Sequence, residues 1–212
     1  MTASSLIALI ELAGVAVFAV SGALAAGRKS LDLLGVVVIA MVTATGGGTL
    51  RDLLLDRTVF WIARPEFLVV TLVAALLTIP YVRFARPPER FLLVADALGL
   101  ALFSTAGAGI ALSLGQPGLV AVVMGTVTGV FGGVLRDVLC AEIPMILRKG
   151  HIYATAAIAG CTLLVLLRHW GVNPTIAATT GMTTVAALRL AAIVFGLTLP
   201  VFSLPAPRDP ES

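Results

Sequence analysis

Long runs of apolar residues, separated by short polar breaks, dominate the chain. Seven of these runs have about 20 residues, the length that a helix needs to cross the roughly 30 Å hydrocarbon core of a bilayer. They cover residues 5–26, 33–57, 66–84, 91–113, 117–140, 150–168 and 175–203. The breaks between them carry glycine, proline and charged residues, which end helices and form turns. The pattern predicts an all-α membrane protein with seven transmembrane helices.

The composition excludes the other broad classes of protein. Hydrophobic residues make up 59% of the 212 residues and charged residues 12%, whereas soluble domains have about 45–50% and about 25%. Disordered chains have low hydrophobicity and high charge. Cys140 and Cys161 lie inside apolar runs, which excludes a secreted disulfide scaffold. We expect one transmembrane domain over residues 1–203 in the lipid bilayer and a disordered cytoplasmic tail over 204–212.

Basic residues gather at one set of helix ends. The net charge of +3 follows this membrane pattern, and no nucleic-acid partner is expected. One side of the predicted bundle holds Arg28, Lys29, Arg83, Arg86, Arg90, Arg148, Lys149 and Arg208, and the other mainly Arg57, Arg64 and Arg168. The positive-inside rule places the N-terminus outside and the C-terminus in the cytoplasm. The first run has no basic segment before it, so we expect a retained helix and not a cleaved signal.

The chain repeats itself at an offset of 85 residues. Matching pairs include Gly14 with Gly99, Phe18 with Phe103, Gly22 with Gly107, and Leu50-Arg51-Asp52 with Leu135-Arg136-Asp137. Each copy, about 5–84 and about 91–168, contains three predicted spans. Because three is an odd number, the second copy has to insert upside down, as in the inverted repeats of membrane transport proteins. The helix predicted at 175–203 stands outside the repeat.

Both copies carry consecutive glycines deep inside a span. They are Gly46, Gly47 and Gly48 in the first copy and Gly132 and Gly133 in the second. The first block begins about 14 residues, or roughly 20 Å, into its helix. Consecutive glycines weaken a helix, so we expect the second and fifth helices to kink there and to free backbone carbonyls and amides.

The surroundings of these glycines predict a polar path for ions. Freed carbonyls at this depth are tolerated where they face protein or water. Together with the hydroxyls of Thr43, Thr45 and Thr128 they are suitable ligands for a dehydrated K⁺ or Na⁺. Asp52 and Asp137 are expected in the first turn of each continuing half-helix, at its positive end. The alternative is that the glycines serve only close helix packing, and the two roles can coexist.

Several charged residues fall inside apolar runs. A charge at the bilayer centre costs about 2.5–3.5 kcal/mol on insertion scales, so partners or water are expected. Glu11 and Asp96 are equivalent in the repeat, and we hypothesise that they pair with Arg51 and Arg136. Arg189, near the middle of the last predicted helix, is expected to line a pore or to lock helices together.

Motifs for enzymatic chemistry are missing from the sequence. His151 and His169 have no ligand partner at suitable spacing, and no phosphate-binding loop or nucleophile–base pattern is present. We therefore expect no enzyme, no cofactor and no metal beyond transient K⁺.

The doubled Gly-Gly-x-x-Arg-Asp block resembles the prokaryotic trimeric intracellular cation (TRIC) channel family, whose domain is also labelled glycine transporter. Phe18-x-x-x-Gly22, Phe103-x-x-x-Gly107 and the helix from Arg189-x-x-Ala192 to Leu199-Pro200 extend the resemblance over residues 5–203. It implies a homotrimer in a prokaryotic inner membrane with one pore per protomer, lined by the two kinked helices. It also implies passive conduction of potassium ions. Animal members carry a lysine motif that contacts an inositol lipid, but Thr49-Leu50 and Val134-Leu135 stand here instead.

Two other functions fit parts of the pattern. Inverted repeats with broken helices also suit a carrier for a small zwitterion such as glycine, and the sequence does not separate this carrier from a channel. A seven-helix photoreceptor requires a lysine in the last helix, and residues 175–203 contain none.

Overall fold

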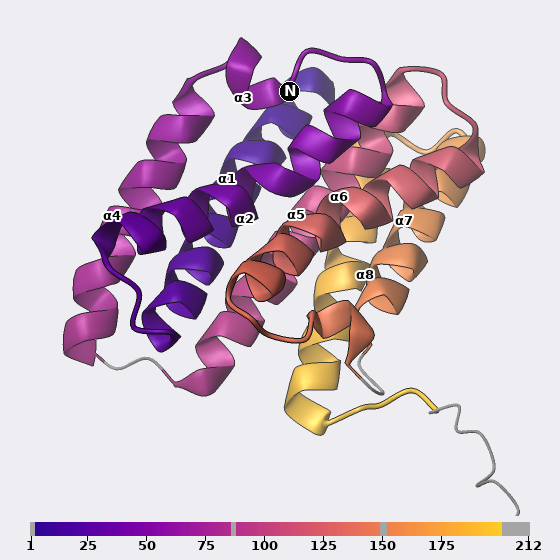
Figure 1. Ribbon diagram of the computed structural model, residues 1–212. Helices are drawn as coiled ribbons and strands as arrows, with labels where there is room; N and C mark the ends of the chain where they lie inside the picture. Colours follow the sequence, from indigo (N-terminus) through magenta and orange to yellow (C-terminus); the bar gives the residue numbers. More distant parts are fainter. Residues whose placement is uncertain (1–2, 86–87, 149–151, 201–212) are drawn as a thin grey trace, which may run out of the picture.

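The structure is a computed structural model that describes residues 3–85, 88–148 and 152–200. Its elements in chain order are α1 (Ala3–Arg28), α2 (Leu33–Leu54), α3 (Phe60–Ala63), α4 (Glu66–Ala85), α5 (Glu89–Ser113), α6 (Gly118–Leu139), the 3₁₀ turn η1 (Met145–Leu147), α7 (Ala154–His169) and α8 (Pro174–Phe195). The helices form one bundle, with α4 at one edge and α7 and α8 at the other (Figure 1).

Five helices of the described chain are long and apolar enough to cross a membrane. They are Ala8–Arg28, α2, Arg90–Ser113, α6 and α8. Shorter apolar helices cover Glu66–Val82 and Ala154–His169. The described residues form helices with no strand ladder, so the all-α membrane fold is confirmed. The count of seven spans stays a prediction. The tail at 204–212 and Arg86, Lys149, His151 and Arg208 lie outside the described residues.

Several helix ends differ from the predicted ones. The second span, expected to residue 57, ends at Leu54, and the last, expected to 203, ends at Phe195. Asp56 follows α2 with φ of 51°, and Gly196 follows α8 with φ of 65°. A residue in the left-handed region ends the run of helical hydrogen bonds, although the apolar sequence continues. The fifth span, expected over 117–140, is α6 with one residue fewer at each end, and the sixth, expected over 150–168, corresponds to α7, which begins at Ala154 and ends at His169.

Helices α1 and α5 pack through two phenylalanines and two glycines. The rings of Phe18 and Phe103 are stacked with centroids 5.3 Å apart. A Cβ added at Gly99 would overlap the ring of Phe18, and one at Gly14 would lie 3.0 Å from the ring of Phe103. Each glycine therefore makes room for the ring on the other helix, and this reciprocal contact fills the centre of the bundle.

Helices α2 and α6 cross at the glycine blocks with their backbones in contact. A Cβ at Gly47 would overlap the carbonyl oxygen of Thr128, and one at Gly132 would overlap the carbonyl oxygen of Thr43. Both helices are continuous through these glycines. The predicted break into half-helices is therefore wrong, and the glycines serve the close packing that was the alternative. A bend without a break stays a prediction.

Replacing Gly47 with alanine tests this crossing. The new Cβ meets a backbone carbonyl that cannot rotate away, so Gly47→Ala should lower the free energy of unfolding in detergent by about 1–3 kcal/mol, the usual cost of overpacking. Gly27→Ala is the control, because its Cβ would meet only a side-chain carbon of Val82 at 3.4 Å. Thermal unfolding of both variants measures the difference, and equal stabilities would contradict the tight crossing.

Candidate functional site

Arg51 lies at the centre of a buried ionic network near the end of α2. Its Nη1 is 2.8 Å from Oε1 of Glu11 on α1, and its Nε donates to Oδ1 of Asp52 at 2.9 Å. Arg51 and Asp52 are completely buried. At the edge of this first network, Nη1 of Arg57 lies 3.6 Å from Oδ1 of Asp52. Two carboxylates thus compensate a cation that water does not reach.

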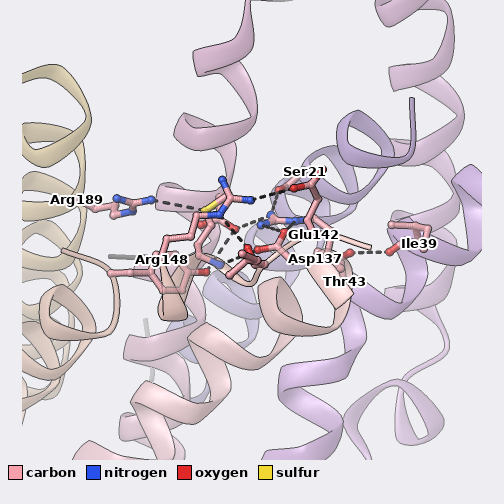
Figure 2. A network of polar contacts seen from close by, with 12 residues as sticks. Ser21, Ile39, Thr43, Asp137, Glu142, Arg148 and Arg189 are labelled. Atoms are coloured by element: carbon pink, nitrogen blue, oxygen red, sulfur yellow. Dashed lines mark hydrogen bonds and ion pairs between the residues drawn. The ribbon is translucent and has the colours of Figure 1, made fainter. Parts of the chain in front are cut away.

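Arg136 forms a second network of the same kind near the end of α6. Its Nη1 is 2.6 Å from Oδ1 of Asp96 on α5 and donates to Oγ of Ser21, and its Nε donates to Oδ1 of Asp137 at 2.9 Å. The hydroxyl of Tyr153 donates to the same oxygen of Asp96 at 3.4 Å. Figure 2 shows this region, with Ser21 and Asp137 labelled. The hypothesis that Glu11 and Asp96 pair with the two arginines is confirmed.

The two aspartates lie in the last turns of their helices. Oδ2 of Asp52 accepts the backbone N–H of Phe60, and Oδ2 of Asp137 accepts that of Met145, each at 2.9 Å. Their predicted place in the first turn of a half-helix is wrong, because α2 and α6 do not restart before them. The carboxylates fasten the segments that follow the helices. Sequence reasoning missed both amides, although Phe60 and Met145 occupy equivalent positions in the 85-residue repeat.

The hydroxyls of the predicted threonines are bound within their own helices. Thr43 donates to the carbonyl of Ile39, Thr45 to that of Met41 and Thr128 to that of Met124, at 2.6, 2.8 and 2.5 Å. All three side chains are buried. Each hydroxyl proton is therefore committed to the helix, and the hydroxyl oxygen keeps the capacity to face a cation. Figure 2 shows the bond from Thr43 to Ile39.

A crevice of about 290 Å³ reaches the second network from the end of the bundle where α1 ends. We call it the Asp137 crevice. Its walls are Ala25, Arg28, Lys29, Leu92, Leu93, Asp137, Cys140, Glu142, Met145 and Arg148. At its surface Nζ of Lys29 lies 2.6 Å from Oε1 of Glu142, and Nη2 of Arg148 lies 3.6 Å from Oε2. Asp137 is the member of the two networks that borders this crevice, whereas the walls do not reach Gly47 or Gly132.

Arg189 approaches the second network from α8, on the left of Figure 2. It is 2% exposed. Its guanidinium carbon lies 5.0 Å from the centre of the Tyr153 ring, and its Nη1 donates to the carbonyl of Ile152 at 3.4 Å. These contacts connect α8 to the segment before α7. The structure therefore brings Arg189 beside the second network and leaves it without a direct ion pair among the described residues.

Histidine, cysteine and carboxylate side chains of the described residues form no group of three that could hold a metal ion.

The chain is similar to a family model, to curated membrane proteins and to solved structures. A family model described as "Glycine transporter" matches residues 8–83 and 93–169. The chain is similar to the UPF0126 inner membrane protein YadS of Escherichia coli K12, at 46% identity over 92% of the chain and 95% of that protein. It also matches the solved TRIC trimeric intracellular cation channel orthologue from Rhodobacter sphaeroides, at 41% identity and a TM-score of 0.87, over 91% of the chain and 100% of that structure. A structure described under conductance through TRIC cation channels matches at 33% identity and a TM-score of 0.84, over 93% and 98%.

Removing one carboxylate of the second network should destabilise the fold. Asp96→Asn leaves the buried Arg136 with one carboxylate, and breaking a buried ion pair costs about 3–5 kcal/mol. We expect a large fall in the melting temperature in detergent. Glu66→Gln is the control, because the Arg64–Glu66 pair is half exposed and exposed pairs contribute little. A melting temperature for Asp96→Asn equal to that of the control would show that the network does not hold the fold.

Lys29 should set the acidity of Glu142. The hydrogen bond from Lys29 lowers the pKa of Glu142 below its usual 4.5, and nearby Arg148 adds to the effect. The contact is therefore kept above the lowered pKa and lost as the pH falls through it. Lys29→Gln should raise the titration midpoint of the Glu142 carboxyl in ¹³C NMR, and Lys29→Arg should keep it low. A midpoint unchanged in Lys29→Gln would contradict the contact.

Proposed function

Because the chain belongs to the prokaryotic trimeric intracellular cation (TRIC) channel family, we propose that it is a passive, K⁺-conducting channel of the bacterial inner membrane. The observation that carries this proposal is the 41% identity to a TRIC channel orthologue over 91% of the chain. The TRIC name also supports a homotrimer, in which each protomer has its own pore.

The proposed topology is a three-plus-three inverted repeat followed by α8. Both bounds of α6, Gly118 and Leu139, lie 85 positions after the bounds of α2, Leu33 and Leu54. The two segments matched by the family model start 85 residues apart, at 8 and 93. The first network lies towards the start of α1 and the second towards its end, as opposite orientation requires. The cations Arg28, Lys29 and Arg148 favour the cytoplasm for the end that carries the Asp137 crevice.

The proposed gate is the crossing of α2 and α6. In the described conformation Gly47 and Gly132 lie against the carbonyls of Thr128 and Thr43, which leaves no room for a hydrated ion between them. Conduction therefore requires the two helices to separate or rotate. Separation would expose these carbonyls and the nearby threonine oxygens to the path, where they could replace water around K⁺.

Asp137 is proposed to attract cations at the cytoplasmic entrance. It borders the crevice, whereas Asp52, its equivalent, is completely enclosed. Both carboxylates bind an arginine and a backbone amide in the same way. Asp52 therefore supplies a matched control for the structural part of the role.

A carrier for glycine or another small zwitterion is the second candidate. The description of the matching family model favours it, and inverted repeats serve alternating access as well as channels. The two candidates differ in kinetics, since a carrier shows saturable counterflow and a channel shows unitary current steps.

Purified protein in liposomes and planar bilayers separates the two. We expect K⁺ flux with unitary current steps and no accelerated exchange of labelled glycine against internal glycine. Empty liposomes give the leak. Saturable glycine counterflow without current steps would overturn the channel proposal.

Neutralising Asp137 should weaken cation selectivity. In a KCl gradient, Asp137→Asn should shift the reversal potential towards that of Cl⁻, because the entrance loses its accessible negative charge. Asp52→Asn removes the equivalent negative charge at an enclosed position and should keep the reversal potential of the unaltered channel. Equal reversal potentials in the two variants would remove this role from Asp137.

A further inference from the structure

Arg189 has hydrogen-bonding capacity that the described residues do not use. A guanidinium carries five N–H donors. Here Nη1 makes one long bond of 3.4 Å to the carbonyl of Ile152, Nη2 meets only the sulfur of Met145 at 3.7 Å, and Nε has no partner. Arg51 and Arg136, by contrast, each bind two carboxylates. Since Arg189 is 2% exposed, bulk water does not make up the difference.

Charge balance alone does not explain why Arg189 is buried with unused hydrogen-bond donors. Asp96 and Asp137 carry two negative charges against the one positive charge of Arg136, so Arg189 neutralises the second network at a distance. Tyr153 contacts both partners, with its hydroxyl on Asp96 and its ring under Arg189. Attraction across the ring stabilises the charge but gives the guanidinium no acceptor. Buried donors in native proteins are almost always paired, so an acceptor beyond the described residues is expected.

A cavity of about 220 Å³ opens beside this guanidinium, and we call it the Arg189 cavity. Its apolar walls include Leu93 at the start of α5 and Ile193 on α8, and Thr198 adds one hydroxyl from the segment after α8. The share of one water in the liquid is about 30 Å³, so the cavity holds far more than a single bridging water. It lies at the end of the bundle that also carries Lys29 and Arg148, because Leu93 lines both this cavity and the Asp137 crevice.

The chemistry of the cavity selects one class of ligand. A planar guanidinium with free donors binds oxyanions such as phosphate, often through two parallel hydrogen bonds. Apolar walls around it suit a hydrocarbon chain attached to that head. We infer that the Arg189 cavity is a binding site for a phosphate group carrying an apolar chain, the chemistry of an anionic phospholipid at the cytoplasmic leaflet. The inference does not depend on whether the protein is a channel or a carrier.

The test measures binding of phosphatidylglycerol to delipidated protein by native mass spectrometry. Phosphatidylcholine with the same acyl chains gives the neutral-lipid reference, and sodium phosphate without lipid gives the free-oxyanion arm. We expect Arg189→Gln to bind phosphatidylglycerol about tenfold more weakly or worse, as the loss of a charge-assisted hydrogen bond predicts. A different result is that sodium phosphate alone raises the melting temperature of the unaltered chain and not that of Arg189→Gln. That result would support the same oxyanion site and identify a soluble ion as its ligand.

Two further variants keep the test decisive. Arg148→Gln removes a half-exposed cation from the same end of the bundle, and it should keep the binding that Arg189→Gln loses. Ala192→Leu fills the cavity and leaves Arg189 in place, so it should lose binding even if Arg189→Gln does not fold. The inference is overturned if Arg148→Gln and Arg189→Gln lose binding equally, or if Ala192→Leu binds phosphatidylglycerol as tightly as the unaltered chain.

Discussion

The fold depends on two buried arginines that are each held by two carboxylates. An unpaired charge in an apolar interior is unfavourable by several kcal/mol, so each arginine requires its acids on neighbouring helices before the bundle can close. Arg51 thereby joins α2 to α1 through Glu11, and Arg136 joins α6 to α5 through Asp96. Asp52 and Asp137 extend the same networks to the segments after α2 and α6. The α1–α2 and α5–α6 links and the positions of the segments after α2 and α6 follow from this constraint.

The two networks are alike in their centres and differ at their edges. Arg57 lies beside Asp52 in the first network. The equivalent position in the second, 85 residues later, holds Glu142, which binds Lys29. The cation that balances the second network comes instead from α8, outside the repeat. With Glu142 in the place of a cation and Arg189 as the balancing charge, Asp137 borders the Asp137 crevice and Arg189 borders the Arg189 cavity. The structural differences between the two networks therefore arise from a few residues at their edges.

The sequence predicted the pairing of charges better than the role of the glycines. The offset of 85 residues placed Glu11 and Asp96 in equivalent positions, and the need to compensate a buried arginine then indicated their partners. Glycine, in contrast, permits both a kink and a close approach of two backbones, and only the carbonyls of Thr43 and Thr128 across the crossing decide between them. The end of α2 was predicted three residues too late because Asp56, which adopts positive φ there, carries no glycine signal, whereas the end of α6 was predicted to within one residue. The contact of Lys29 with Glu142 joins residues 113 positions apart, and no local sequence pattern predicts it.

The backbone contact between α2 and α6 also determines how these helices can move. Where side chains interlock, one helix slides over another only after rotamers change. At Gly47 and Gly132 no side chain stands between the two backbones, so a small translation along the contact meets little steric resistance. The ionic anchors Arg51 and Arg136, one turn further along the same helices, resist such a displacement. The closest backbone approach and the ionic anchor therefore occupy neighbouring turns of each helix, so any displacement at the crossing is transmitted directly to the arginine networks.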